Sequence, residues 1–97
     1  MNRQGKIISD SLNEKGEFFS TKSVEIDRII EELDEAKVEV MQIWKGSSSN
    51  SILRQYEELR PSVSKFVELS QEIGEQLKNI AQTIEEVDIQ IVNQTKL

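Results

Sequence analysis

The sequence contains no cysteine and no histidine. Without cysteine there can be no disulfide or thiolate nucleophile, and without histidine the commonest general base and zinc ligand is missing. The four glycines are scattered and form no phosphate-binding loop. The many carboxylates fall mostly outside the apolar pattern, where water solvates them. We therefore expect no catalytic, cofactor-binding or metal-ligating residues, no small-molecule substrate and no enzymatic activity.

Positive charge and long apolar runs are also scarce. Twelve basic residues face 18 acidic ones, which gives a net charge of -6. A nucleic acid is not an expected partner, because phosphate binding requires a basic face. The longest apolar runs are a few residues, so no segment is expected to span a membrane. The first ten residues include basic side chains but no apolar segment follows them, so we predict no Sec-type signal peptide.

The second half of the chain has a regular apolar stripe. Steps of four and three residues alternate without a slip, which is a heptad pattern and predicts a helix over about 51–93. Position d of the heptad holds Ile52, Leu59, Phe66, Ile73, Ile80 and Val87. Position a holds Tyr56, Val63, Ser70, Leu77, Ile84 and Ile91. We predict that Leu59, Val63, Phe66, Ile73, Leu77 and Ile80 form the core and dimer face.

The neighbouring position e widens this stripe. Its middle is small or apolar, and Gly74 and Ala81 would let another helix approach closely. Ser70 interrupts the apolar stripe and either selects the register and partner or is a tolerated small residue. Pro61 lies inside the predicted helix and should either kink it near Glu57 or separate two helices; the unbroken heptad phase favours the kink.

The first half is less regular. Ile26, Ile30, Leu33, Val40 and Trp44 keep helical spacing, which predicts a helix over about 20–45. Two glycines weaken the pattern upstream, so residues 1–19 are expected to be helical or frayed. No strand pattern is present in the sequence.

The predicted helices are separated by Trp44-Lys45-Gly46 and the polar run Ser47–Ser51. A glycine after the last periodic residue ends a helix, and a serine-rich stretch supplies a turn and an N-cap. We predict a turn over 46–50, with Trp44 covering the end of the core. A turn this short makes the two helices antiparallel neighbours.

These elements predict an all-α fold in which residues 1–97 form a single antiparallel helix-turn-helix hairpin. Two helices with such wide apolar stripes cannot hide both flanks from water. A second hairpin, either a copy of this chain or a different one, would complete a four-helix bundle. We therefore expect a dimer.

The position of Trp44-Lys45-Gly46 at the bend of an all-helical chain of 97 residues carries a resemblance to a known family. The chain resembles the WXG family of early-secreted-antigen-like proteins, small substrates and partners of type VII secretion. The resemblance covers the whole chain in length and layout. It implies a helical hairpin that dimerises into a four-helix bundle and leaves a Gram-positive or mycobacterial cell without a cleaved signal peptide. Such proteins are associated with virulence.

The resemblance also implies recognition residues. Trp44 and Gly46 correspond to the tryptophan and glycine that the secretion machinery reads. A second family element, Tyr-x-x-x-Asp/Glu, usually comes late in the second helix. This chain departs from it: Tyr56 comes early, with Arg60 four residues on, and the nearest late match is Ile84 with Asp88.

Three functions remain open at the level of sequence. The first is a type VII secretion substrate or targeting partner that acts through helix packing. The second is a helper that pairs with the helical N-terminal domain of a larger LXG-type toxin, which would suit the degenerate tail element. The third is a cytosolic helical adaptor unrelated to secretion.

Overall fold

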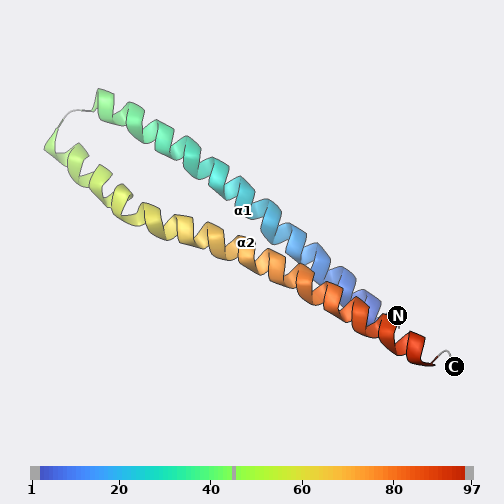
Figure 1. Ribbon diagram of the computed structural model, residues 1–97. Helices are drawn as coiled ribbons and strands as arrows, with labels where there is room; N and C mark the ends of the chain where they lie inside the picture. Colours follow the sequence, from blue (N-terminus) through green and yellow to red (C-terminus); the bar gives the residue numbers. More distant parts are fainter. Residues whose placement is uncertain (1–2, 45, 96–97) are drawn as a thin grey trace. The chain divides into compact units, whose positions relative to one another are not determined.

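The computed structural model describes the backbone of residues 3–44 and 46–95, with side chains at 3–44, at 46 and at 50–87. This part of the chain is all helical. It consists of α1, Arg3–Ile43, and α2, Ser47–Thr95 (Figure 1). The predicted all-α helical hairpin is confirmed. In the described residues, neither helix is long and apolar enough to cross a membrane.

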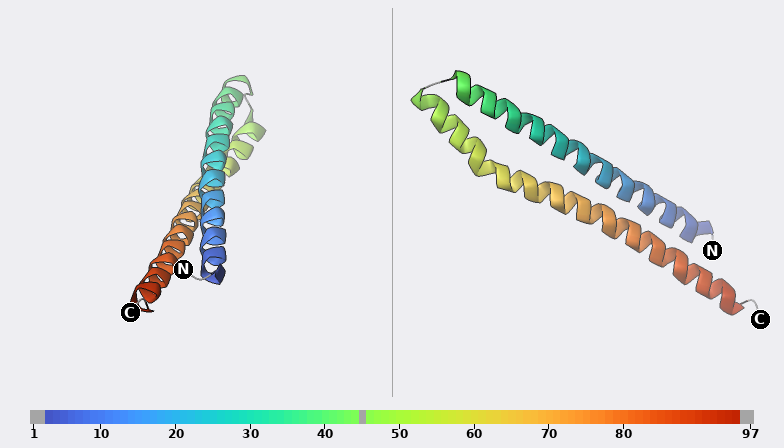
Figure 2. Two further views of the ribbon diagram at one scale, coloured as in Figure 1. Left: turned by 90° about the vertical axis from the view of Figure 1, so that its right-hand side faces the viewer. Right: turned by 45° about the horizontal axis from the view of Figure 1, so that its top comes forward.

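The hairpin divides into two compact units, each built from a piece of both helices. The bend unit is Lys22–Leu69, and the terminal unit joins residues 1–21 to residues 70–97. Within each unit the two helical segments lie side by side and run antiparallel in all the views (Figures 1 and 2). The prediction of a single domain over 1–97 stays a prediction.

Helix α1 begins much earlier than the apolar spacing alone indicated. It includes residues 3–19, which were expected to be helical or frayed. The reason lies in the packing: Ser9 is fully buried and Gly16 is buried. Long helices are stabilised mainly by tertiary contacts, which here outweigh the low helix propensity of glycine.

Helix α2 also begins earlier, at Ser47, so the predicted turn over 46–50 is wrong. The Asn50 N–H donates to the Gly46 carbonyl at 3.3 Å, which makes Gly46 the N-cap residue of α2. The serine run therefore belongs to the first turn of the helix.

Pro61 lies inside α2, which continues through it as one helix. The proline removes one backbone hydrogen bond of the helix, and this loss usually kinks the helix one turn upstream. Figures 1 and 2 show α2 bending in the yellow-green stretch around residues 56–61. A kinked continuous helix, rather than two separate helices, is the outcome that the unbroken heptad phase favoured.

Small residues line the contact between the helices of the terminal unit. A Cβ atom built on Gly74 would lie 2.6 Å from Ser20 Oγ and 2.8 Å from the Gly16 carbonyl oxygen. Ser70 and Ala81 are also buried in this unit. The prediction that Gly74 and Ala81 permit close helix approach is confirmed, and the approaching helix is α1 of the same chain.

Candidate interaction site

Position d of the heptad remains largely open to solvent in the single chain. Leu59 is 65% exposed and Phe66 is 57% exposed, and Ile80 is exposed as well. Residues at e, by contrast, include Val67, Gly74 and Ala81, all buried. Val63 and Leu77 at position a are half-buried, and so is Ile73 at position d. The hairpin thus packs mainly around positions a and e. The other residues at position d are exposed and form an outward apolar row, the d row: Ile52, Leu59, Phe66, Ile80 and Val87.

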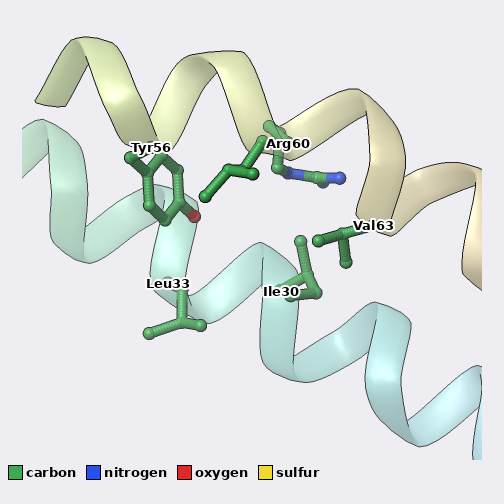
Figure 3. A pocket seen from close by; sticks show the side chains of 6 residues that line it. Ile30, Leu33, Tyr56, Arg60 and Val63 are labelled. Atoms are coloured by element: carbon green, nitrogen blue, oxygen red, sulfur yellow. The ribbon is translucent and has the colours of Figure 1, made fainter.

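In the bend unit this apolar row borders a hollow between α1 and α2. It is lined by Ile30 and Leu33 of α1 and by Tyr56, Leu59, Arg60 and Val63 of α2. Figure 3 shows Ile30 and Val63 pointing toward one another across it. Half-buried apolar side chains around an open hollow form a surface that another apolar side chain can fill.

A polar cluster joins the two helices of the bend unit. Asp34 accepts a hydrogen bond from the Tyr56 hydroxyl at 2.7 Å, and from Arg60 Nε at 3.0 Å and Nη2 at 2.9 Å. The bonds from Arg60, and then that from Tyr56, hold the pKa of Asp34 below its usual value. The bond to Asp34 correspondingly raises the pKa of Tyr56. These three side chains fix the register of α1 against α2.

This cluster also gives the single tyrosine a structural role. Tyr56 has its hydroxyl on Asp34 and its ring 5.5 Å from Lys37 Nζ, which itself lies 3.5 Å from Glu57 Oε1. Sequence reasoning did not single out Asp34. The available signals were Lys37, which replaces an apolar residue in the stripe of the first helix, and Arg60 at position e. Lys37 and Arg60 each place a positive charge between the two helices, and such a charge needs a negatively charged partner.

The cluster predicts a measurable acid dependence of stability. Because the folded-state pKa of Asp34 is lowered, its contribution to stability is complete above the unfolded-state pKa and is lost as the pH falls through the folded-state pKa. At pH 7 we expect the wild type to melt at a higher temperature than Asp34→Asn. This difference should shrink as the pH falls below 3.8, the ordinary value for aspartate. Thermal unfolding followed by circular dichroism measures it.

The matched control is Glu35→Gln, which removes an exposed carboxylate from the next position of the same helix. At pH 7 and also below pH 3.8, this substitution should leave the melting temperature close to that of the wild type. A difference between wild type and Asp34→Asn that stays constant across the acid range would show that the cluster is not a titrating contact.

The bend holds the two residues predicted for recognition at the end of α1. The Trp44 N–H donates to the Val40 carbonyl at 2.8 Å, so Trp44 directly follows the last turn of the helix. Trp44 is 41% exposed, so more than half of its surface is covered. That Trp44 covers the end of the core stays a prediction. A Cβ atom on Gly46 would meet nothing within 4 Å.

The predicted tail element lies in the terminal unit. Ile84 is half-buried, one residue before Glu85, which accepts a hydrogen bond from the buried Ser9 hydroxyl at 3.1 Å. The Asp88 side chain lies outside the described residues. The bend residues and the tail residues belong to different units. The described residues contain no group of three acidic, histidine or cysteine side chains that could hold a metal ion.

The fold and the bend define a class of protein: a small helical hairpin with Trp-x-Gly where the chain turns. The family model described as "Proteins of 100 residues with WXG" matches residues 6–89, and the chain therefore belongs to the WXG100 family. The family suggested by Trp44-Lys45-Gly46 is confirmed.

Individual relatives agree with this assignment. Protein YukE of Bacillus subtilis (strain 168) is 29% identical over 91 residues, which is 94% of each chain. Type VII secretion system extracellular protein A of Staphylococcus aureus (strain USA300) is 30% identical over 88 residues, 91% of each chain. The crystal structure of Geobacillus thermodenitrificans EsxA superimposes with a TM-score of 0.85 at 34% identity, covering 92% of this chain and 99% of that one. The protein is thus a WXG-family protein of the type VII secretion class.

Proposed function

We propose that this chain is a non-enzymatic type VII secretion substrate or targeting partner that leaves the cytoplasm without a cleaved signal peptide. The observation that carries the proposal is the exposed Trp44 at the bend between two long helices. Similarity to a relative named as an extracellular type VII protein supports export. Packing between helices, rather than chemistry, is the activity that this residue inventory supports.

Its first partner would be a second helical hairpin, either a copy of this chain or a related protein. The exposed d row, represented by Leu59, Phe66 and Ile80, is too apolar to remain in water along the length of α2. A second hairpin laid on this row would bury it and complete a four-helix bundle. The half-buried Val63, Ile73 and Leu77 would then become part of the same core.

Its second partner would be the secretion machinery. Trp44 and Gly46 at the bend would carry recognition, with Ile84 and Asp88 as a weaker tail element. The open space around Gly46 supports this assignment, because packing inside the chain does not require a glycine there. Tryptophan is enriched among the residues that anchor a protein partner.

Export of a Trp44→Ala variant tests the recognition role. We expect the secreted amount in a type VII-competent Gram-positive host to fall about tenfold or more, as when a binding anchor is truncated. The helical circular dichroism signal should remain, because Trp44 is partly exposed and follows the last residue of α1. Quantitative immunoblotting of supernatant and cell fractions measures the effect.

Phe18→Ala is the matched control, since Phe18 is another exposed aromatic residue but lies in the terminal unit. Its export should match that of the wild type. Secretion of folded Trp44→Ala at the wild-type level would refute the recognition role. A cytosolic helical adaptor would then be the remaining function. For such an adaptor, Trp44→Phe should change neither the fold nor the function.

A helper role with an LXG-type toxin is the second candidate. The late tyrosine of the tail element is missing, since Ile84 occupies the matching position, so this chain would borrow part of its export signal from a partner. Light scattering after size-exclusion chromatography of the lone chain separates the two roles. A stable dimer favours a self-sufficient substrate, whereas a monomer that forms a complex only with the toxin domain favours the helper.

A further inference from the structure

The hollow in the bend unit has room for a side chain from outside the hairpin. It measures about 230 Å³, whereas an engineered protein cavity of about 150 Å³ already holds a benzene molecule. Five of its six lining side chains are aliphatic or aromatic, and the sixth belongs to Arg60. Arg60 brings no unpaired charge, because its Nη2 lies 2.9 Å from Asp34 Oδ2. The hollow therefore suits an apolar side chain.

The face of α2 that borders the hollow is free of charge along the helix. From Ile52 to Val87, position d holds only apolar residues. Position g, the outer neighbour of d, is exposed and uncharged over the same stretch: Gln55, Ser62, Leu69, Gln76 and Thr83. The next position round the helix, c, is mostly charged: Glu58, Lys65, Glu72 and Glu86. An uncharged strip beside a charged one has the composition of an interface centre and its rim.

This strip can pair with itself. In a twofold dimer each contact occurs twice, with the roles of the two copies exchanged. One antiparallel register of two α2 helices sets every residue at position d against another: Ile52 faces Val87, Leu59 faces Ile80, and Phe66 faces Ile73. A shift of one heptad either sets Ile52 against Gln94 or moves Val87 past the start of the other helix at Ser47. The matched register therefore covers the most apolar surface.

The hollow favours this antiparallel pairing over a parallel one. In a parallel pair each residue at position d meets its own counterpart, so two hollows would face each other and stay empty. Protein interiors are close-packed, and such voids lose van der Waals contacts. In the antiparallel register, the hollow beside Leu59 meets Ile80 of the other copy. Ile80 is 49% exposed, and its neighbour Ala81 is fully buried, so an outward side chain meets a hollow.

Resting on the proposed pairing with a second hairpin, we infer that the second hairpin is a copy of this chain and that its Ile80 fills the hollow of the bend unit. Because the dimer is symmetric, Ile80 of each copy enters the hollow of the other. Ile80 is then a specificity residue. A hairpin with a small or charged residue in its place would leave the hollow empty or bury an unpaired charge, and would be rejected.

Disulfide cross-linking tests the register directly, because the chain has no cysteine of its own. Differently tagged Leu59→Cys and Ile80→Cys chains, mixed in equal amounts and mildly oxidised, should form a disulfide between the two variants. Facing positions bring their Cβ atoms close enough for this bond. The control mixture is Leu59→Cys with Val87→Cys, which lies one heptad further along the same row and should not cross-link. Non-reducing gels and mass spectrometry of the linked peptides identify the products.

Truncation of Ile80 tests the filling of the hollow. Ile80→Ala should raise the dissociation constant of the dimer at least about tenfold, because both hollows lose the side chain that fills them. The control is Ile7→Ala, since Ile7 is 58% exposed in the same unit but lies on α1, outside the d row. It should dissociate like the wild type. Light scattering after size-exclusion chromatography of a dilution series measures both constants.

The outcomes separate this inference from the proposed function. A dimer in which Leu59→Cys links mainly to itself, or in which the control mixture links equally well, would overturn the inference. So would an unchanged dissociation constant for Ile80→Ala. A wild-type chain that stays monomeric would also overturn it, and a related hairpin would then be the partner. None of these results alters the export of Trp44→Ala, which decides the recognition role.

Discussion

Replacing Leu59 and Phe66 together by glutamate should convert the proposed dimer to a monomer. Both residues lie in the exposed d row of α2, where the hairpin itself leaves them in solvent. In a closed symmetric dimer each substitution occurs twice, and each glutamate would be desolvated without a partner. We expect the dissociation constant to rise at least about a hundredfold, the result of an uncompensated charge in an interface.

Size-exclusion chromatography with light scattering at several protein concentrations measures this change. The control is Val24→Glu with Val38→Glu, which adds the same charge at two exposed valines of α1 in the bend unit. The control pair should remain dimeric. If the Leu59/Phe66 variant were still a dimer at low micromolar concentration, the d row would not be the interface.

Gly74→Leu should strongly destabilise the hairpin. The first side-chain carbon would already lie 2.6 Å from Ser20 Oγ and 2.8 Å from the backbone oxygen of Gly16. The backbone oxygen cannot move without shifting α1. Leucine is a far better helix former than glycine, so a loss of stability can only come from the clash between helices. We expect the free energy of unfolding to fall by about 2 kcal/mol or more.

Chemical denaturation at a fixed protein concentration measures the loss, since dimer stability depends on concentration. Gln76→Leu adds leucine at an exposed position of the same helix and should be nearly neutral. Gly46→Ala removes a glycine with nothing around its Cβ position and should cost only a small capping effect. Wild-type stability of Gly74→Leu would mean that the helices of the terminal unit are not held in close contact.

The helices and their apolar stripe could be predicted because their cause is local. A periodicity of 3.5 to 3.6 residues places the apolar side chains on one side of a helix, whatever that helix later packs against. The break between the helices was equally visible, although its bounds moved: α1 ends at Ile43 and α2 starts at Ser47. The bounds moved because Gly46 is the N-cap residue of α2. The sequence pattern had indicated this glycine only as the residue that ends the first helix.

The division of the stripe could not be predicted from its spacing. Val67 and Ala81 are buried within the hairpin whereas Leu59 and Phe66 are exposed, although all four belong to the same broad apolar face. The choice depends on where two backbones can approach closely, and in the terminal unit this is where Gly16 meets Gly74. The link between Asp34, Tyr56 and Arg60 is equally non-local.

By itself, the sequence determined that this protein has two long helices, where the chain turns, and which family it resembles, because helix periodicity and a short motif are properties of neighbouring residues. The tertiary structure alone decided that α1 reaches back to Arg3, that Trp44 is exposed, and that the d row faces outward. Those features depend on contacts between residues far apart in the chain, where close packing of small residues chooses which side of each helix is covered.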